Sequence, residues 1–178
     1  MKLPVFKYHP DPLDTGSIVK SGKKCRCCGK KTGFIYAGPA YAEEELDQVI
    51  CPWCIADGSA AERFDATFVD ESGIGDGEVA VSSEVEEEIS RRTPGFSGWQ
   101  QERWLGCCND AAAFLGTMGR SELEKLGPKA LNAVREECAL QDQEWADYLK
   151  ALDRNKGPTA YLFRCLHCGG LRAYSDCH

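Results

Sequence analysis

The chain has 178 residues, of which 43% are apolar, and this is enough for one compact domain with a hydrophobic core. Its eleven cysteines would suggest disulfides in a small secreted protein, but residues 1–7 contain no apolar segment of the kind that directs secretion. No stretch of about 18 apolar residues occurs, which excludes a membrane span. We therefore expect a cytoplasmic protein whose cysteines are metal ligands or buried thiols.

The net charge of −7 is distributed unevenly along the chain. No acidic residue occurs between Asp14 and Glu43, and six basic residues fall there: Lys20, Lys23, Lys24, Arg26, Lys30 and Lys31. Their charge can balance a nearby thiolate metal site. It can equally contact phosphates, because Lys and Arg supply most of the non-specific affinity of proteins for nucleic acids. Lys23, Lys24 and Arg26 are therefore candidates for an interaction surface.

Two pairs of cysteines in the first third of the chain have the spacing of a four-thiolate zinc site. Cys25 and Cys28 form one C-x2-C pair, and Cys51 and Cys54 form the second after a gap of 22 residues. Each pair can place both sulfurs on one side of a tight turn, and two such turns complete a tetrahedron around Zn²⁺. Short β-forming runs at 17–19 and 34–36 predict a hairpin beside the first pair. Residues 1–70 are thus predicted to form a zinc-ribbon-like lobe with a structural zinc.

The second pair also resembles the C-x-x-C motif of a thiol redox protein, because capping residues Ser59 and Glu62 predict a short helix just after it. The preceding residues show no clear βαβ unit. Together with Cys25 and Cys28, the sulfurs of Cys51 and Cys54 could instead bind a metal. Redox chemistry at Cys51 and Cys54 remains an alternative to zinc binding.

Residues 80–155 are expected to be mainly helical. Capping boxes predict helices after Ser83 and Ser121, and Asp110 is expected to cap a helix that begins at Ala111. From Pro128 to about Asp153, apolar residues recur at helical spacing. They predict one long amphipathic helix, or two helices with a break near residue 141.

Aromatic residues are concentrated between residues 95 and 105. Large rings here are expected either to pack in a core or to line a concave interaction site. The candidate residues of such a site are Trp99, Gln100, Gln101 and Trp104.

A second cysteine pair of the same type lies near the end of the chain. Residues 159–164 and 171–174 predict two strands on either side of Cys165 and Cys168, forming a hairpin over residues 159–178 that packs back on the body. A second metal site is expected from Cys108, Cys165, Cys168 and Cys177, with Cys107, His167 and His178 as other available donors. The alternative is a similar hairpin with free thiols.

Five segments of the chain resemble the CbrC family, an uncharacterised bacterial group whose name is linked to colicin tolerance. The matching segments are 6–12, 25–29, 51–61, 92–102 and 162–169, which are FKYHPDP, CRCCG, CPWCIADGSAA, RTPGFSGWQQE and LFRCLHCG. The resemblance implies a bacterial cytosolic protein and a link to colicin tolerance, and it implies no reaction.

Together these features predict a single α+β domain with zinc-ribbon-like hairpins, short capped helices and one long amphipathic helix. One Zn²⁺ is expected, and a second is possible. No G-x-S-x-G, H-E-x-x-H or P-loop motif occurs, so we expect a binding protein rather than an enzyme. The expected partner is a macromolecule, a protein in preference to a nucleic acid, with nucleic-acid binding and thiol redox chemistry as alternatives.

Overall fold

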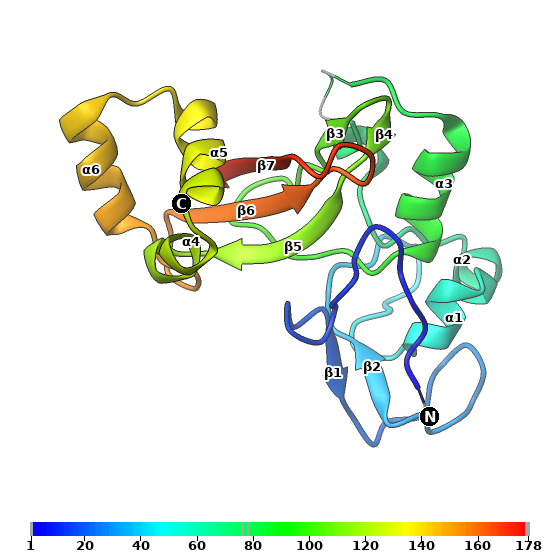
Figure 1. Ribbon diagram of the computed structural model, residues 1–178. Coiled ribbons are helices and arrows are strands. Elements are labelled where there is room, and N and C mark those ends of the chain that lie inside the picture. Colours follow the sequence, from blue (N-terminus) through cyan, green and yellow to red (C-terminus); the bar gives the residue numbers. More distant parts are fainter. Residues whose placement is uncertain (1, 76, 78, 177–178) are drawn as a thin grey trace.

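The computed structural model describes residues 2–75, 77 and 79–176. These residues form a mixed α/β fold with small antiparallel sheets and six α-helices (Figure 1). In Figure 1 the N-terminal lobe carries β1 and β2, and a larger body surrounds the sheet of β5, β6 and β7. The predicted mixture of helices and small antiparallel hairpins is therefore confirmed.

The N-terminal lobe is built on the predicted hairpin. β1 (Ile18–Lys20) pairs antiparallel with β2 (Phe34–Tyr36), with Val19 opposite Ile35. Helices α1 (Pro52–Ala56) and α2 (Ser59–Phe64) follow the second cysteine pair. Apolar side chains of these elements share one core with Cys25, Cys51 and Cys54, so the cysteine site is part of the core of the lobe.

The body is organised around a three-stranded antiparallel sheet of β5 (Ala113–Met118), β6 (Thr159–Arg164) and β7 (Leu171–Asp176), in that order. Aromatic pairs hold its strands together, since the rings of Tyr161 and Tyr174 stack at 4.6 Å and those of Phe114 and Phe163 lie 5.2 Å apart. The predicted β6 and β7 hairpin is confirmed. The 3-10 turn η1 (Glu71–Gly73) and helix α3 (Ser83–Arg92) link the lobe to this body.

Three helices cover one end of the sheet in Figure 1: α4 (Arg120–Leu126), α5 (Pro128–Cys138) and α6 (Asp142–Ala151). The prediction of one long helix is wrong. The alternative prediction, two helices with a break near residue 141, is correct. Ala139 ends α5 in the left-handed conformation with a φ of 55°, and Gln141 is extended. Both backbone conformations stop the helical hydrogen-bond ladder between the two apolar stretches.

The helix predicted at Ala111 is also wrong. The chain forms β3 (Gly106–Cys107) and β4 (Asp110–Ala111), a tight hairpin that runs into β5. The turn residues Cys108 and Asn109 both have positive φ, as a two-residue hairpin of this type requires. Burial of the small side chains from Ala111 to Ala113 against the core outweighs the helix propensity of alanine. Residues 80–155 therefore contain three strands besides their helices.

Candidate metal centres

The first cysteine cluster lies in the core of the N-terminal lobe. The sulfurs of Cys25, Cys28, Cys51 and Cys54 all lie within 4.8 Å of one another, and every one except that of Cys28 belongs to a buried residue. The Sγ to Sγ distances are 3.8 Å for Cys25 and Cys54, 3.9 Å for Cys28 and Cys51, and 3.6 Å for Cys51 and Cys54. A tetrahedron with metal–sulfur bonds of about 2.3 Å has edges of about 3.8 Å. The four sulfurs thus have the spacing of a tetrahedral metal site.

A tight turn presents the first two sulfurs. The amide of Gly29 donates to the carbonyl of Cys25 at 2.8 Å, and the amide of Cys25 donates to the carbonyl of Lys30 at 2.9 Å. Gly29 has a φ of 71°, which favours glycine because it has no Cβ. The other two sulfurs come from Cys51, which precedes α1, and Cys54, which lies within it.

The thiols of the first cluster bind protons unequally when no metal is present. A hydrogen bond from Cys51 lowers the pKa of Cys25 to about 4, and the same hydrogen bond raises the pKa of Cys51. Burial raises the pKa of Cys54. Without a metal, Cys25 is therefore the thiolate, whereas Cys51 and Cys54 keep their protons. A metal that binds all four sulfurs has to displace the remaining protons.

The second cluster combines the C-terminal cysteine pair with the hairpin of β3 and β4. Cys107, Cys108, Cys165 and Cys168 also place their sulfurs within 4.8 Å of one another. The sulfur of Cys107 lies 3.7 Å from that of Cys108 and 3.9 Å from that of Cys168. Only Cys165 is buried, whereas Cys108 and Cys168 are exposed. This cluster has the same tetrahedral spacing as the first but lies at the surface.

The turn of the second cluster repeats that of the first, bond for bond. The amide of Gly169 donates to the carbonyl of Cys165 at 3.1 Å, and the amide of Cys165 donates to the carbonyl of Gly170 at 2.9 Å. Gly169 has a φ of 70°. Burial opposes ionisation of Cys165, but backbone amides of Cys168 and His167 lower the pKa of its thiol to about 6.

A buried carboxylate joins the two halves of the second cluster. Asp110, two residues after Cys108, accepts hydrogen bonds from the Tyr8 hydroxyl at 2.8 Å and from Nε2 of His167 at 2.9 Å. Lys7 lies 3.4 Å from the same carboxylate. Burial opposes ionisation of Asp110, yet the bonds from Tyr8 and His167 lower its pKa overall. Asp110 thereby ties the hairpin to the turn that carries Cys165 and Cys168.

The structure places the predicted ligands of the second site as follows. Cys108, Cys165 and Cys168 lie together, and Cys107 joins them. Cys177 and His178 lie outside the described residues, and His167 contacts Asp110. The sequence signal for Cys107 was its place directly before Cys108; in the structure Cys107 ends β3, and Cys108 begins the turn that follows.

The residues predicted for an interaction surface separate into two groups. Trp104 is 1% exposed and packs in the aromatic core, with its indole N–H donating to the carbonyl of Ala112, so it is corrected to a core residue. Trp99 is 40% exposed, and Gln100 and Gln101 are exposed beside it. Lys23, Lys24 and Arg26 are exposed at the first cluster, and Arg26 pairs with Glu44.

Three proteins similar to this chain come from bacteria and carry only a family name. A protein of Mycobacterium bovis named "UPF0167 protein Mb2317" is 53% identical over 178 residues, covering 98% of this chain and 94% of that protein, and "UPF0167 protein MT2352" of Mycobacterium tuberculosis has the same values. "UPF0167 protein PA1536" of Pseudomonas aeruginosa is 46% identical over 168 residues, covering 94% and 93%. No solved structure matches the chain.

The resemblance to the CbrC family is wrong, because neither the matching family model nor these relatives carry that name. Neither the family description nor the names of these relatives mention the expected link to colicin tolerance. Among the described residues, no helix is long and apolar enough to cross a membrane. A model of the "Uncharacterised protein family (UPF0167)" matches residues 3–177, and the chain belongs to that family.

Proposed function

We propose that this protein binds two Zn²⁺ ions, one in each cysteine cluster, and that both ions stabilise the fold. The observation that carries the proposal is the spacing of the sulfurs, 3.6 to 3.9 Å for the measured pairs in both clusters. This spacing fits the edges of a tetrahedron around a metal, whereas two sulfurs in a disulfide are only about 2.05 Å apart. A tetrahedral site of four thiolates is typical of zinc, with iron as the other common occupant.

Four thiolates fill the coordination sphere of zinc. A catalytic zinc keeps a position open for water or substrate, whereas a structural zinc does not. The proposed role is therefore structural, and the protein acts by binding another molecule. Cysteines that bind zinc have to remain reduced, and the cytoplasm is a reducing compartment. The proposed zinc sites therefore support a cytoplasmic location.

Metal analysis of protein purified without chelator tests the proposal. We expect two zinc ions per chain in the wild-type protein, and one in Cys51→Ser and in Cys107→Ser. Iron in place of zinc would change the metal but keep the sites. Less than about one metal per chain after purification under reducing conditions would contradict the proposal, since structural zinc binds with about 10 to 16 kcal/mol.

The proposed partner is a protein with an acidic surface. Five exposed lysines flank Cys25 and Cys28 in the sequence, and none forms an ion pair with any residue that the structure describes: Lys20, Lys23, Lys24, Lys30 and Lys31. The whole chain has a net charge of −7, which repels an extended polyanion and favours a local acidic contact.

Nucleic-acid binding is the second candidate, favoured by the same lysines. Binding to single-stranded and duplex DNA across a salt series separates the two ideas. A protein that neutralises several phosphates loses affinity steeply as salt rises, and an absent or salt-insensitive interaction excludes this candidate.

The thiol redox alternative has less support from the structure. Cys51 is 0% exposed and Cys54 is 3% exposed, so a substrate disulfide has no access to either sulfur. The pKa of each thiol is raised, by the contact with Cys25 for Cys51 and by burial for Cys54. A redox C-x-x-C motif needs the opposite, an accessible thiol with a lowered pKa.

A further inference from the structure

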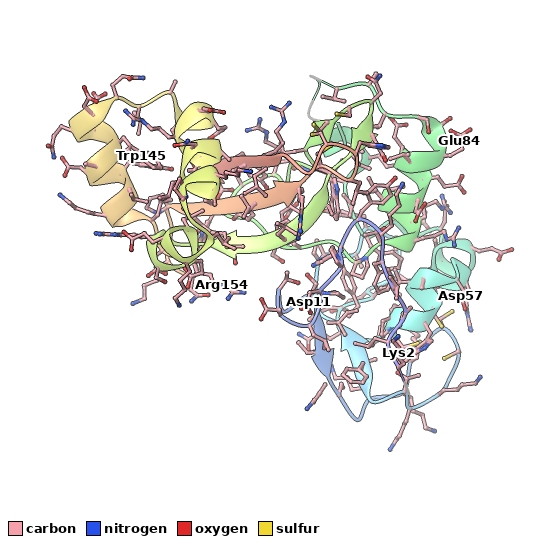
Figure 2. The ribbon with its side chains drawn as sticks, viewed as in Figure 1. Lys2, Asp11, Asp57, Glu84, Trp145 and Arg154 are labelled. Atoms are coloured by element: carbon pink, nitrogen blue, oxygen red, sulfur yellow. The ribbon has the colours of Figure 1, made fainter. Side chains whose placement is uncertain are left out.

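A cavity of about 320 Å³ lies where the N-terminal lobe meets the body. The lobe contributes residues 15–17 and 37–38, and the body contributes residues 96–99 and parts of β5, β6 and the segment after α6. Figure 2 labels Asp11 of the lobe and Arg154 of the body on the two sides of this junction. Its size falls within the range of small-molecule sites, which occur preferentially where two parts of a protein meet.

The cavity contains an arginine in a protein of net negative charge. Among the described lining residues, Arg154 is the only one with a charged side chain. Its Nη2 donates to the carbonyl of Asp14 at 3.0 Å and lies 3.6 Å from the Asp14 carboxylate, which is 70% exposed. An ion pair so exposed is weak, so an anion in the cavity can compete with Asp14 for the guanidinium.

Several polar groups of the cavity wall already have partners. The buried His9 binds the carbonyl of Pro94 through Nδ1 at 2.7 Å and Thr15 through Nε2 at 2.7 Å, which fixes the lobe side of the wall. On the body side, Thr159 donates to the carbonyl of Asp153 and accepts from the indole of Trp99. These groups hold the wall in shape.

Three other polar side chains of the wall are uncommitted. Within the part of the chain that the structure describes, Ser97, Thr117 and Asn155 have no side-chain hydrogen bond. Each can donate one, and they share the cavity with Arg154. Aromatic surface completes the wall through Phe96, Phe114 and the partly exposed Trp99.

We propose that this cavity, the interlobe cavity, binds a small organic anion. A carboxylate or phosphate group pairs with Arg154 and accepts hydrogen bonds from Thr117 and Asn155, and a planar apolar part lies against Trp99. The guanidinium suits both anions because its N–H groups form two parallel bonds to two oxygens. Neither cysteine cluster takes part, so the site is independent of the proposed zinc function.

Calorimetric titration of the metal-loaded chain of 178 residues tests the site with four probes: phenyl phosphate, benzoate, inorganic phosphate and phenol. We expect phenyl phosphate or benzoate to bind with a dissociation constant of about 1 mM or lower. The one that binds more tightly identifies the anion. Phenol should bind more weakly, since it lacks the anion, and inorganic phosphate should bind more weakly, since it lacks the ring.

Variants locate the binding. Arg154→Gln should weaken it at least about tenfold, as expected for losing hydrogen bonds to a charged group, and Arg154→Lys should weaken it less. The matched control is Arg120→Gln, because Arg120 is an exposed arginine on α4 that pairs with Glu124 and does not line the cavity. If Arg154→Gln fails to fold, Thr117→Val should show the same loss with the metal content unchanged.

Three results would overturn the proposal. The first is no binding of phenyl phosphate or benzoate at about 10 mM, ten times the expected dissociation constant. The second is equal binding by the wild type and Arg154→Gln. The third is binding that survives Arg154→Gln but is lost in Lys23→Gln, which would place the anion at the lysines that flank Cys25 and Cys28. None of these results affects the zinc stoichiometry, so the two proposals fail separately.

Discussion

The two cysteine clusters share the same local turn and differ in their surroundings. Both turns have the same two backbone hydrogen bonds and a glycine with φ near 70°. The first cluster has three buried cysteines at the centre of the lobe core, whereas the second has one buried cysteine and lies at the edge of the body. A motif of five residues thus fixes the positions of two of the four sulfurs, and the packing around each cluster sets how much of the fold would depend on a bound metal.

The largest difference between the clusters is expected in stability. Cys51→Ser should lose one metal and destabilise the protein by on the order of 5 kcal/mol, because it leaves a buried polar group and removes the ion that joins the lobe core. Cys168→Ser should lose the other metal at a cost of about 2 kcal/mol, because its side chain is exposed. Urea unfolding with parallel metal analysis measures both. Equal losses would mean that burial does not set the contribution of the metal.

Access of small reagents should also separate the clusters. N-ethylmaleimide is expected to modify Cys108 and Cys168 at least about tenfold faster than Cys51 and Cys54, because thiol reactivity follows exposure. Peptide mass spectrometry over time measures each rate. Cys138, which is half-buried and belongs to neither cluster, provides an internal reference. Simultaneous modification of both clusters would show that the lobe opens as readily as the surface site.

Acid should release the metals in a fixed order. Hydrogen bonds to Cys25 and Cys165 hold the pKa of each thiol below its usual value, so each thiolate is lost only as the pH falls through that lowered pKa. Water and protons reach the exposed Cys108 and Cys168 more readily than the buried Cys51 and Cys54. We expect the second cluster to lose its metal at a higher pH than the first. Metal analysis after dialysis at stepwise lower pH checks the order, and the reverse order would contradict it.

The smallest expected effect concerns the support of the second cluster. Asp110→Asn should weaken metal binding there about tenfold and leave the first cluster unchanged, because it removes a charge that holds His167 and Tyr8 in place. Asp65→Asn is the matched control, since that side chain is 94% exposed. Competition with a coloured chelator gives both affinities. An equal change in both clusters would indicate a global loss of stability instead.

The spacing of the cysteines and of the β-forming residues predicted more of the fold than helix propensity did. The C-x2-C pairs and the β-forming runs beside them gave the two turns and both hairpins, because these features depend on neighbouring residues. Helix propensity was misleading for residues 111–113, because Ala111 pairs with Gly106 of β3 and Ala113 pairs with Arg164 of β6, far along the chain. Trp104 and Cys107 show the same limit. Whether a ring is buried, or which thiol completes a cluster, depends on contacts that spacing does not encode.

The most direct test of the two-cluster account is the rate of zinc release to an excess of chelator. We expect two phases of equal amplitude, one zinc each, with the fast phase absent in Cys168→Ser and the slow phase absent in Cys51→Ser. The phases should differ at least about tenfold in rate, because the first metal leaves only when the lobe core opens. A single phase that releases both metals at one rate, in a wild-type protein with two zinc ions, would contradict the account.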